Sequence, residues 1–194
     1  MNCKISSAIS VFACLTCILG VGAAAFAQSG TQSNAQSAKP VIYTTTPKLA
    51  IAKLKSGESN DYDVRGKAAF TLTAANDNDT VAGTLVYTIP DDARQKIAQL
   101  SAKPLASIPA SVTKKDVIAG FQSGTACPVV ILEIGATELE LAGMKLRFNR
   151  ITLDVIETAD QVPQHFCAWT RQINAKRQRR GIIASLNRLI TGEQ

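Results

Sequence analysis

The chain has one histidine, His165, and it lies two residues before Cys167. A histidine that takes the proton of a cysteine thiol creates a thiolate nucleophile, so Cys127 or Cys167 with His165 as base would form a nucleophilic pair. In an oxidising compartment the two cysteines would instead pair with each other, which removes the nucleophile. We therefore predict that His165 lies in a loop near a disulfide and has no catalytic role.

The spacing of the other possible ligands does not support a metal site. Tetrahedral zinc needs three or four converging ligands, and two distant cysteines with one histidine are too few. The run Asn76–Asp79 resembles the start of a calcium loop, but with Asp77 as position one, position six is Ala82 rather than glycine and position twelve is Thr88 rather than glutamate. We predict a polar hairpin loop here, with no metal and no cofactor.

The sequence also lacks a convincing pair of carboxylates for acid–base chemistry. Glu138 and Glu140 fall on the charged outer face of a predicted hairpin, and Asp61 and Asp63 flank a turn. The sequence contains no Gly-x-Ser-x-Gly motif, phosphate-binding glycine loop or dinucleotide fingerprint. No residue is therefore assigned to catalysis, and an enzyme of unrecognised class is kept as an alternative.

The strongest chemical signal is a concentration of positive charge near the C-terminus. Residues 28–167 contain fourteen basic and fourteen acidic residues, whereas residues 168–194 contain six basic residues and one acidic residue. Such a segment is typical of proteins that bind anionic lipid, lipopolysaccharide or acidic polysaccharide, and we expect no nucleic acid in an exported protein. The predicted anion-binding residues are Arg171, Lys176, Arg177, Arg179, Arg180 and Arg188.

Three roles are open for this basic segment. It can bind an anionic partner, or it can dock on the domain through Ile183, Leu186 and Ile190, which recur at helical spacing. A third possibility is proteolytic cleavage after Arg180, which would release residues 181–194.

The N-terminus has the features of a secretory signal peptide. Lys4 precedes an apolar stretch from Ala8 to Phe26, and residues 25–27 form a small-x-small cleavage site. The alternative is a membrane anchor that is retained. We predict an exported protein, periplasmic or secreted, whose mature chain begins at Gln28 and contains 167 residues.

Removal of residues 1–27 leaves two of the five cysteines, Cys127 and Cys167. The simplest arrangement in an exported protein is a disulfide between them. Closing a loop of about forty residues would stabilise the fold by roughly 4 kcal/mol in the chain-entropy model.

Alternating apolar residues predict two hairpins. In the first, a turn at Ala142 and Gly143 places Leu141 opposite Met144 and Glu138 opposite Arg147, which puts apolar pairs on one face and opposite charges on the other. The apolar positions then change parity, and a bulge or bend at residues 149–150 would explain the change.

The second hairpin joins residues 62–74 to residues 80–89, with Phe70 opposite Leu85 and Ala74 opposite Val81. A helix is expected from Asp91 to Ala102, followed by either a short helix from Thr113 or a strand from Asp116.

The expected fold is α+β and mainly β. It consists of an antiparallel sandwich or curved sheet, one internal helix and a C-terminal helical tail interrupted at Gly181. The expected organisation is a signal peptide (1–27), a flexible linker (28–40), a β-rich domain (41–167) and a basic amphipathic tail (168–194). The first functional hypothesis is a non-catalytic binding or envelope-associated module that contacts anionic partners through the tail. A structural or assembly protein of a secreted complex is a further alternative, and the sequence makes no prediction of oligomeric state.

Overall fold

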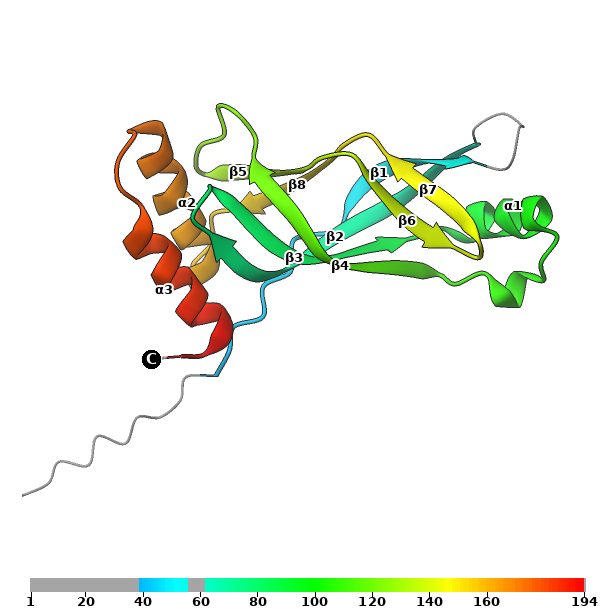
Figure 1. Ribbon diagram of the computed structural model, residues 1–194, viewed down its shortest axis with the longest axis horizontal. Helices are drawn as coiled ribbons and strands as arrows, with labels where there is room; N and C mark the ends of the chain where they lie inside the picture. The colour runs from blue at the N-terminus through cyan, green and yellow to red at the C-terminus, as the bar shows by residue number, and fades with distance from the viewer. Residues whose placement is uncertain (1–38, 56–61, 194) are drawn as a thin grey trace, which may run out of the picture. The chain divides into compact units, whose positions relative to one another are not determined.

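Antiparallel strands dominate the computed structural model, which describes residues 39–55 and 62–193 (Figure 1). These residues all belong to one compact unit, Ala35–Gln194. The predicted signal peptide and all but the last two residues of the predicted linker lie outside the described residues.

One eight-stranded sheet has the order β6-β7-β1-β2-β3-β4-β5-β8, and every neighbouring pair is antiparallel. The strands are β1 (Lys48–Lys55), β2 (Tyr62–Asn76), β3 (Thr80–Thr88), β4 (Ser111–Phe121), β5 (Val129–Ile134), β6 (Thr137–Leu141), β7 (Met144–Phe148) and β8 (Ile151–Ile156). The helices are α1 (Asp91–Ser101), a 3₁₀ turn (Leu105–Ser107), α2 (Gln161–Asn174) and α3 (Arg180–Thr191).

The sheet curls, so that strands distant in the strand order come together. Strand β1 contacts β8 and β4 contacts β6. Lys48 on β1 donates to Asp154 on β8 at 2.7 Å, and Lys114 on β4 donates to Thr137 on β6 at 2.9 Å. The α+β class with a curved antiparallel sheet is confirmed, as a single curled sheet rather than two stacked ones.

The inner face of the sheet contains the core, because alternate residues of β1, β2 and β3 are buried. Tyr87 illustrates how tightly this face is packed. Its ring lies edge-on to Phe148, with centroids 4.9 Å apart, and its hydroxyl donates to the carbonyl oxygen of Val64 at 2.8 Å. Burial raises the pKa of Tyr87 to about 12, so the phenol stays neutral at physiological pH.

The first predicted hairpin is confirmed. Strands β6 and β7 pair with Leu141 opposite Met144 and Glu138 opposite Arg147. Ala142 and Gly143 both have positive φ, 53° and 83°, which are the values that a primed two-residue turn requires. The parity change at residues 149–150 is a bend, which is one of the two predicted causes, and not a bulge. The chain bends there, leaves β7, and forms β8 beside β5 at the other edge of the sheet.

The second hairpin keeps the predicted register only in part. Phe70 pairs with Leu85, but the register shifts between Leu72 and Ala74, so Ala74 pairs with Ala82 and not with Val81. The extra residue lets buried Ala75 lie opposite buried Val81. A bulge was needed because the apolar positions of β2 change parity here.

Three local predictions have different outcomes. Of the two alternatives after Thr113 the strand is correct, and it begins earlier, at Ser111, because pairing with β3 outweighs the local helix-capping pattern. The predicted internal helix is confirmed as α1, which ends at Ser101, one residue before the expected end. The predicted interruption at Gly181 is wrong. The C-terminal helices are separated by residues 175–179, and Gly181 lies inside α3.

The close approach of Tyr87 to Gly66 gives a stability test. A methyl group at Gly66 would lie 2.6 and 2.7 Å from Cζ and Oη of Tyr87 and would also collide with the carbonyl oxygen of Thr88. We expect Gly66→Ala to lower the free energy of unfolding by about 1–3 kcal/mol, measured by urea denaturation.

Gly120→Ala is the matched control, since a methyl group there meets no atom within 4 Å. Its stability should stay unchanged or rise by about 0.4–1 kcal/mol. Equal destabilisation by the two substitutions would contradict the packing described for Tyr87.

Candidate functional site

The C-terminal residues form a helical hairpin, which we define as α2, the linker 175–179 and α3. Helix α3 packs on β2, with Ile183 and Leu186 in the core. The side chain of Asn187 also continues the hydrogen bonding of β2, because it accepts from the backbone N–H of Ala75 at 2.7 Å and donates to the carbonyl oxygen of Ala75 at 2.9 Å. The basic segment is therefore docked on the sheet.

Helix α2 is held by an aromatic cluster and by the disulfide. Trp169 and Phe166 are fully buried, and both pack edge-on against Phe121 of β4 with centroids 4.9 and 5.8 Å apart. This packing explains why the helix begins at Gln161, before the predicted domain boundary at Cys167.

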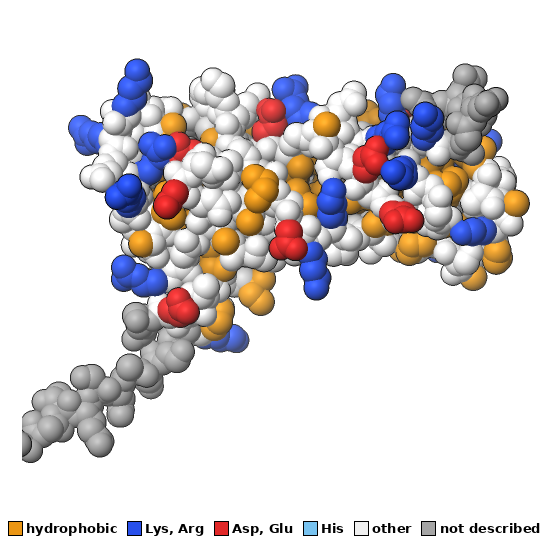
Figure 2. Space-filling view, in the orientation of Figure 1, with side chains coloured by type: hydrophobic (Ala, Val, Ile, Leu, Met, Phe, Trp, Pro, Cys, Tyr) orange, Lys and Arg blue, Asp and Glu red, His pale blue; other side chains and the backbone are white. Residues whose placement is uncertain are grey.

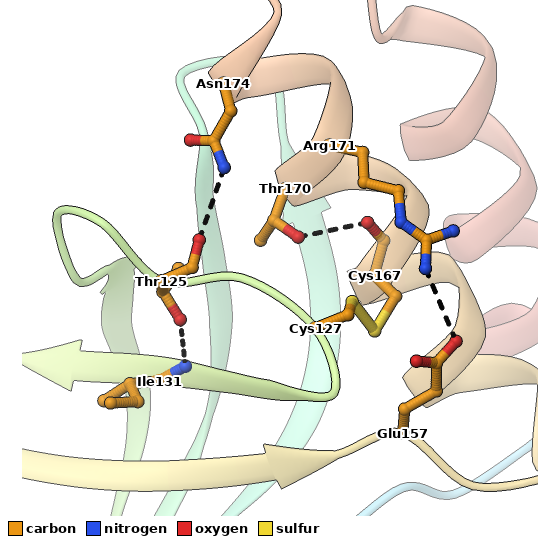
Figure 3. The surroundings of a disulfide bond; sticks show 8 residues. All are labelled: Thr125, Cys127, Ile131, Glu157, Cys167, Thr170, Arg171 and Asn174. Atoms are coloured by element: carbon orange, nitrogen blue, oxygen red, sulfur yellow. Dashed lines mark hydrogen bonds and ion pairs between the residues drawn. A yellow bond between two sulfur atoms is a disulfide. The ribbon is translucent and has the colours of Figure 1, made fainter.

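The predicted disulfide is confirmed. Cys127 lies in the loop before β5 and Cys167 lies in the middle of α2, with Cα atoms 5.5 Å apart (Figure 3). Thr125 strengthens the same junction, since its hydroxyl accepts from the N–H of Ile131 at 2.6 Å and its carbonyl oxygen accepts from Asn174 at 3.4 Å.

His165 lies in helix α2 and not in a loop, which corrects that prediction. Its Nδ1 is 2.8 Å from the carbonyl oxygen of Gln161, one helical turn earlier. The ring borders a cavity of about 570 Å³ between the N-terminal segment, α2 and α3, together with Lys39, Arg188 and Leu189.

The grouping of Cys127, Glu157 and Cys167 within 4.8 Å offers little to a metal ion. The two sulfur atoms are bonded to each other, so the carboxylate of Glu157 is the one remaining ligand, and it faces Arg171 at 3.9 Å. Within the described ranges no other such group of ligands occurs.

Arg179 has a structural partner. Its guanidinium makes two hydrogen bonds to the carboxylate of Asp79, in the turn between β2 and β3. The indole N–H of Trp169 donates to the same carboxylate at 3.1 Å. Asp79 thus joins the linker and α2 to the sheet, and we call this group of three side chains the Asp79 clamp.

The other predicted anion-binding residues are exposed. Arg171 has its side chain 68% exposed, with Glu157 as its acidic partner. No ion pair is present for the remaining four within the described part of the chain, and Lys and Arg side chains gather over α2, the linker and α3 in Figure 2. These exposed cations, which we call the hairpin basic surface, are Arg171, Lys176, Arg177, Arg180 and Arg188.

An apolar feature adjoins this surface. Val41 donates its N–H to the carbonyl oxygen of Leu189 at 2.8 Å, which holds the N-terminal segment beside the end of α3. The next residue, Ile42, is 81% exposed. Sequence reasoning missed this residue, because nothing in its local pattern shows that the chain passes beside α3.

A second group of cations was also missed. Lys55, Lys103, Lys145 and Arg147 line a cavity of about 590 Å³ near α1, at the other end of the sheet. Counting charge along the chain could not reveal it, since these residues are dispersed among acidic ones. The group could be found only by knowing that β1 pairs with β7.

None of the helices in the described ranges is long and apolar enough to cross a membrane. Comparison with family models, curated proteins and solved structures yields no match.

The disulfide should contribute to stability. Because Cys127 and Cys167 are 40 residues apart, we expect the double variant Cys127→Ala/Cys167→Ala to lose about 2–5 kcal/mol of unfolding free energy in urea. Wild-type protein unfolded by urea in the presence of a reductant should give the same denaturation curve as the double variant. If reduction leaves the unfolding midpoint unchanged, the disulfide has not formed in the protein.

The Asp79 clamp gives a second test. Asp79→Asn removes the charge that faces Arg179 but keeps a residue that tolerates the φ of 61° at this position. We expect a loss of about 1–3 kcal/mol in unfolding free energy. Asp77→Asn, in the same turn but exposed, should change stability little, and an equal effect of both variants would contradict the clamp.

Proposed function

We propose that this protein is an exported, non-catalytic module that binds anionic membrane surfaces through the hairpin basic surface. The observation that carries the proposal is the exposure of five cations on the docked helical hairpin, three on its helices and two in its linker. One carboxylate, that of Glu157, pairs with them among the described residues. Cations held in this way attract anionic headgroups with about 1 kcal/mol per residue near the membrane surface.

Docking favours binding, because a rigid surface loses less conformational entropy on contact than a flexible tail does. Arg179 has a supporting role in the proposal, since its guanidinium is engaged by Asp79 and fixes the linker. Arg171, Lys176, Arg177, Arg180 and Arg188 are the residues that would meet the headgroups.

Ile42 supplies the apolar part of the contact. Its exposed side chain lies in the segment beside the end of α3, and the preceding residue, Val41, lines a cavity with Lys39, Arg188 and Glu193. Ile42 itself lines a separate hollow with Asp160. An exposed apolar side chain on a surface that also carries cations is the combination that interfacial membrane binding uses. This arrangement favours a lipid surface over an acidic polysaccharide, which would engage the charges alone.

The proposed binding would take place in the periplasm or the extracellular space. The disulfide between Cys127 and Cys167 is consistent with an oxidising environment. Membranes that face such compartments present anionic phospholipid or lipopolysaccharide headgroups, and the experiment below separates lipid from polysaccharide.

The test measures co-sedimentation with vesicles of phosphatidylcholine, with and without phosphatidylglycerol. We expect binding to the anionic vesicles alone and a decrease with added salt. The double variant Arg177→Ala/Arg180→Ala should bind about 10–30-fold more weakly, since it removes two of the exposed cations.

Lys96→Ala/Lys115→Ala is the matched control, because both lysines are exposed and lie outside the helical hairpin. It removes the same charge and should keep wild-type binding. Equal loss in the two double variants would show that net charge alone drives binding and would overturn the proposal. Retention on heparin without vesicle binding would identify a polysaccharide as the partner instead.

A further inference from the structure

The cavity near α1 has a strongly cationic lining. It lies between the β6–β7 turn, the end of β1 and the C-terminal end of α1. Four of its lining side chains are basic, and the described residues contribute no acidic one. Leu100 and Met144 add apolar surface.

The pairing of β1 with β7 places like charges side by side. Lys55 lies directly opposite Lys145, and Lys53 lies directly opposite Arg147. Like charges at such positions destabilise a sheet. The β6–β7 pairing shows the usual alternative, since Glu138 and Glu140 lie opposite Arg147 and Lys145. A local arrangement that opposes stability is characteristic of a functional site.

Neighbouring carboxylates neutralise only part of this charge. Glu138 contacts Arg147 at 2.7 Å and Lys145 at 3.3 Å, and the hydrogen bond from Lys145 is the largest cause that lowers the pKa of Glu138. No ion pair joins Lys55 or Lys103 to any carboxylate in the part of the chain that the structure describes. Among the described residues, two ammonium groups therefore border the cavity without an acidic partner.

Lys103 is held in place. Its Nζ donates to the carbonyl oxygen of Ala142 at 2.6 Å, which fixes the ammonium group over the β6–β7 turn. Two carbonyl oxygens near the end of α1 have other donors, since Ser101 Oγ donates to that of Ile97 at 2.7 Å and the N–H of Lys103 donates to that of Ala98 at 3.1 Å. The cationic side of the cavity is thus preorganised.

We infer that this cavity binds a phosphate or diphosphate group carried by a larger ligand. A multivalent oxyanion matches two ammonium groups that no carboxylate of the described residues pairs with, and lysine is a common ligand for phosphate as a point charge. Leu100 and Met144 would contact the less polar remainder of the ligand. This site is independent of the hairpin basic surface and does not rest on the proposed membrane function.

The substitution Lys55→Glu separates binding from stability. It places a carboxylate opposite Lys145, so the unfolding temperature should rise by about 1–3 °C. Affinity for inorganic diphosphate, measured by isothermal titration calorimetry, should fall at least about tenfold. A purely structural role for Lys55 would not produce opposite effects on the two quantities.

Lys96→Glu is the matched control, because Lys96 is exposed on α1 and does not line the cavity. It makes the same change of charge and should keep diphosphate affinity. Lys103→Gln is a second binding variant and should weaken diphosphate without adding a negative charge. Equal weakening by Lys55→Glu and Lys96→Glu, or no diphosphate binding by wild type, would overturn the site.

The source of the phosphate group is tested by competition with glucose 6-phosphate and with short-chain phosphatidic acid. Displacement of diphosphate by one of them identifies a soluble phosphate ester or a lipid headgroup, and either result supports the site. If neither competes, the cavity does not accept a larger ligand and the inference fails. Arg177→Ala/Arg180→Ala should keep diphosphate affinity, so failure of the membrane proposal leaves this test intact.

Discussion

The structure depends on covering the inner face of one curled sheet. Eight strands present an apolar face too large to leave in water, and the curl brings β1 to β8 and β4 to β6, so that much of this face covers itself. Helix α2 covers part of what remains, through Phe166 and Trp169, and α3 packs on β2. The proposed binding surfaces then lie on the outer sides of elements whose inner sides complete the core.

This arrangement gives the positive charge of the C-terminal segment a fixed geometry. The disulfide holds α2 to the loop before β5, the Asp79 clamp holds the linker to the β2–β3 turn, and Asn187 holds α3 to β2. The three attachments lie at different points along the helical hairpin. The cations between them are therefore presented by a supported surface, whereas an isolated amphipathic tail would become ordered only on binding.

The sequence correctly predicted features that depend on residues close together in the chain or on composition. The β6–β7 register followed from residues within one hairpin, and the disulfide followed from the number of cysteines left once the predicted signal peptide is removed. The full length of the strand around Thr113 and the crossover to β8 depend on partners outside their own segments, which overrode local preferences. The second cationic site was missed for the same reason. Lys55 and Lys145 meet only when β1 pairs with β7.

The structure also bears on the third role considered for the basic segment, cleavage after Arg180. Proteases act on chain that can become extended, and the bond between Arg180 and Gly181 lies in the first turn of α3. Cleavage there requires unwinding a helix whose Ile183 and Leu186 belong to the core. Removal of that helix would uncover β2. A deletion of the helix would therefore disturb folding, whereas point substitutions of the exposed cations test function without removing core residues. Docking of α3 therefore favours the proposed binding role of its charges over proteolytic release.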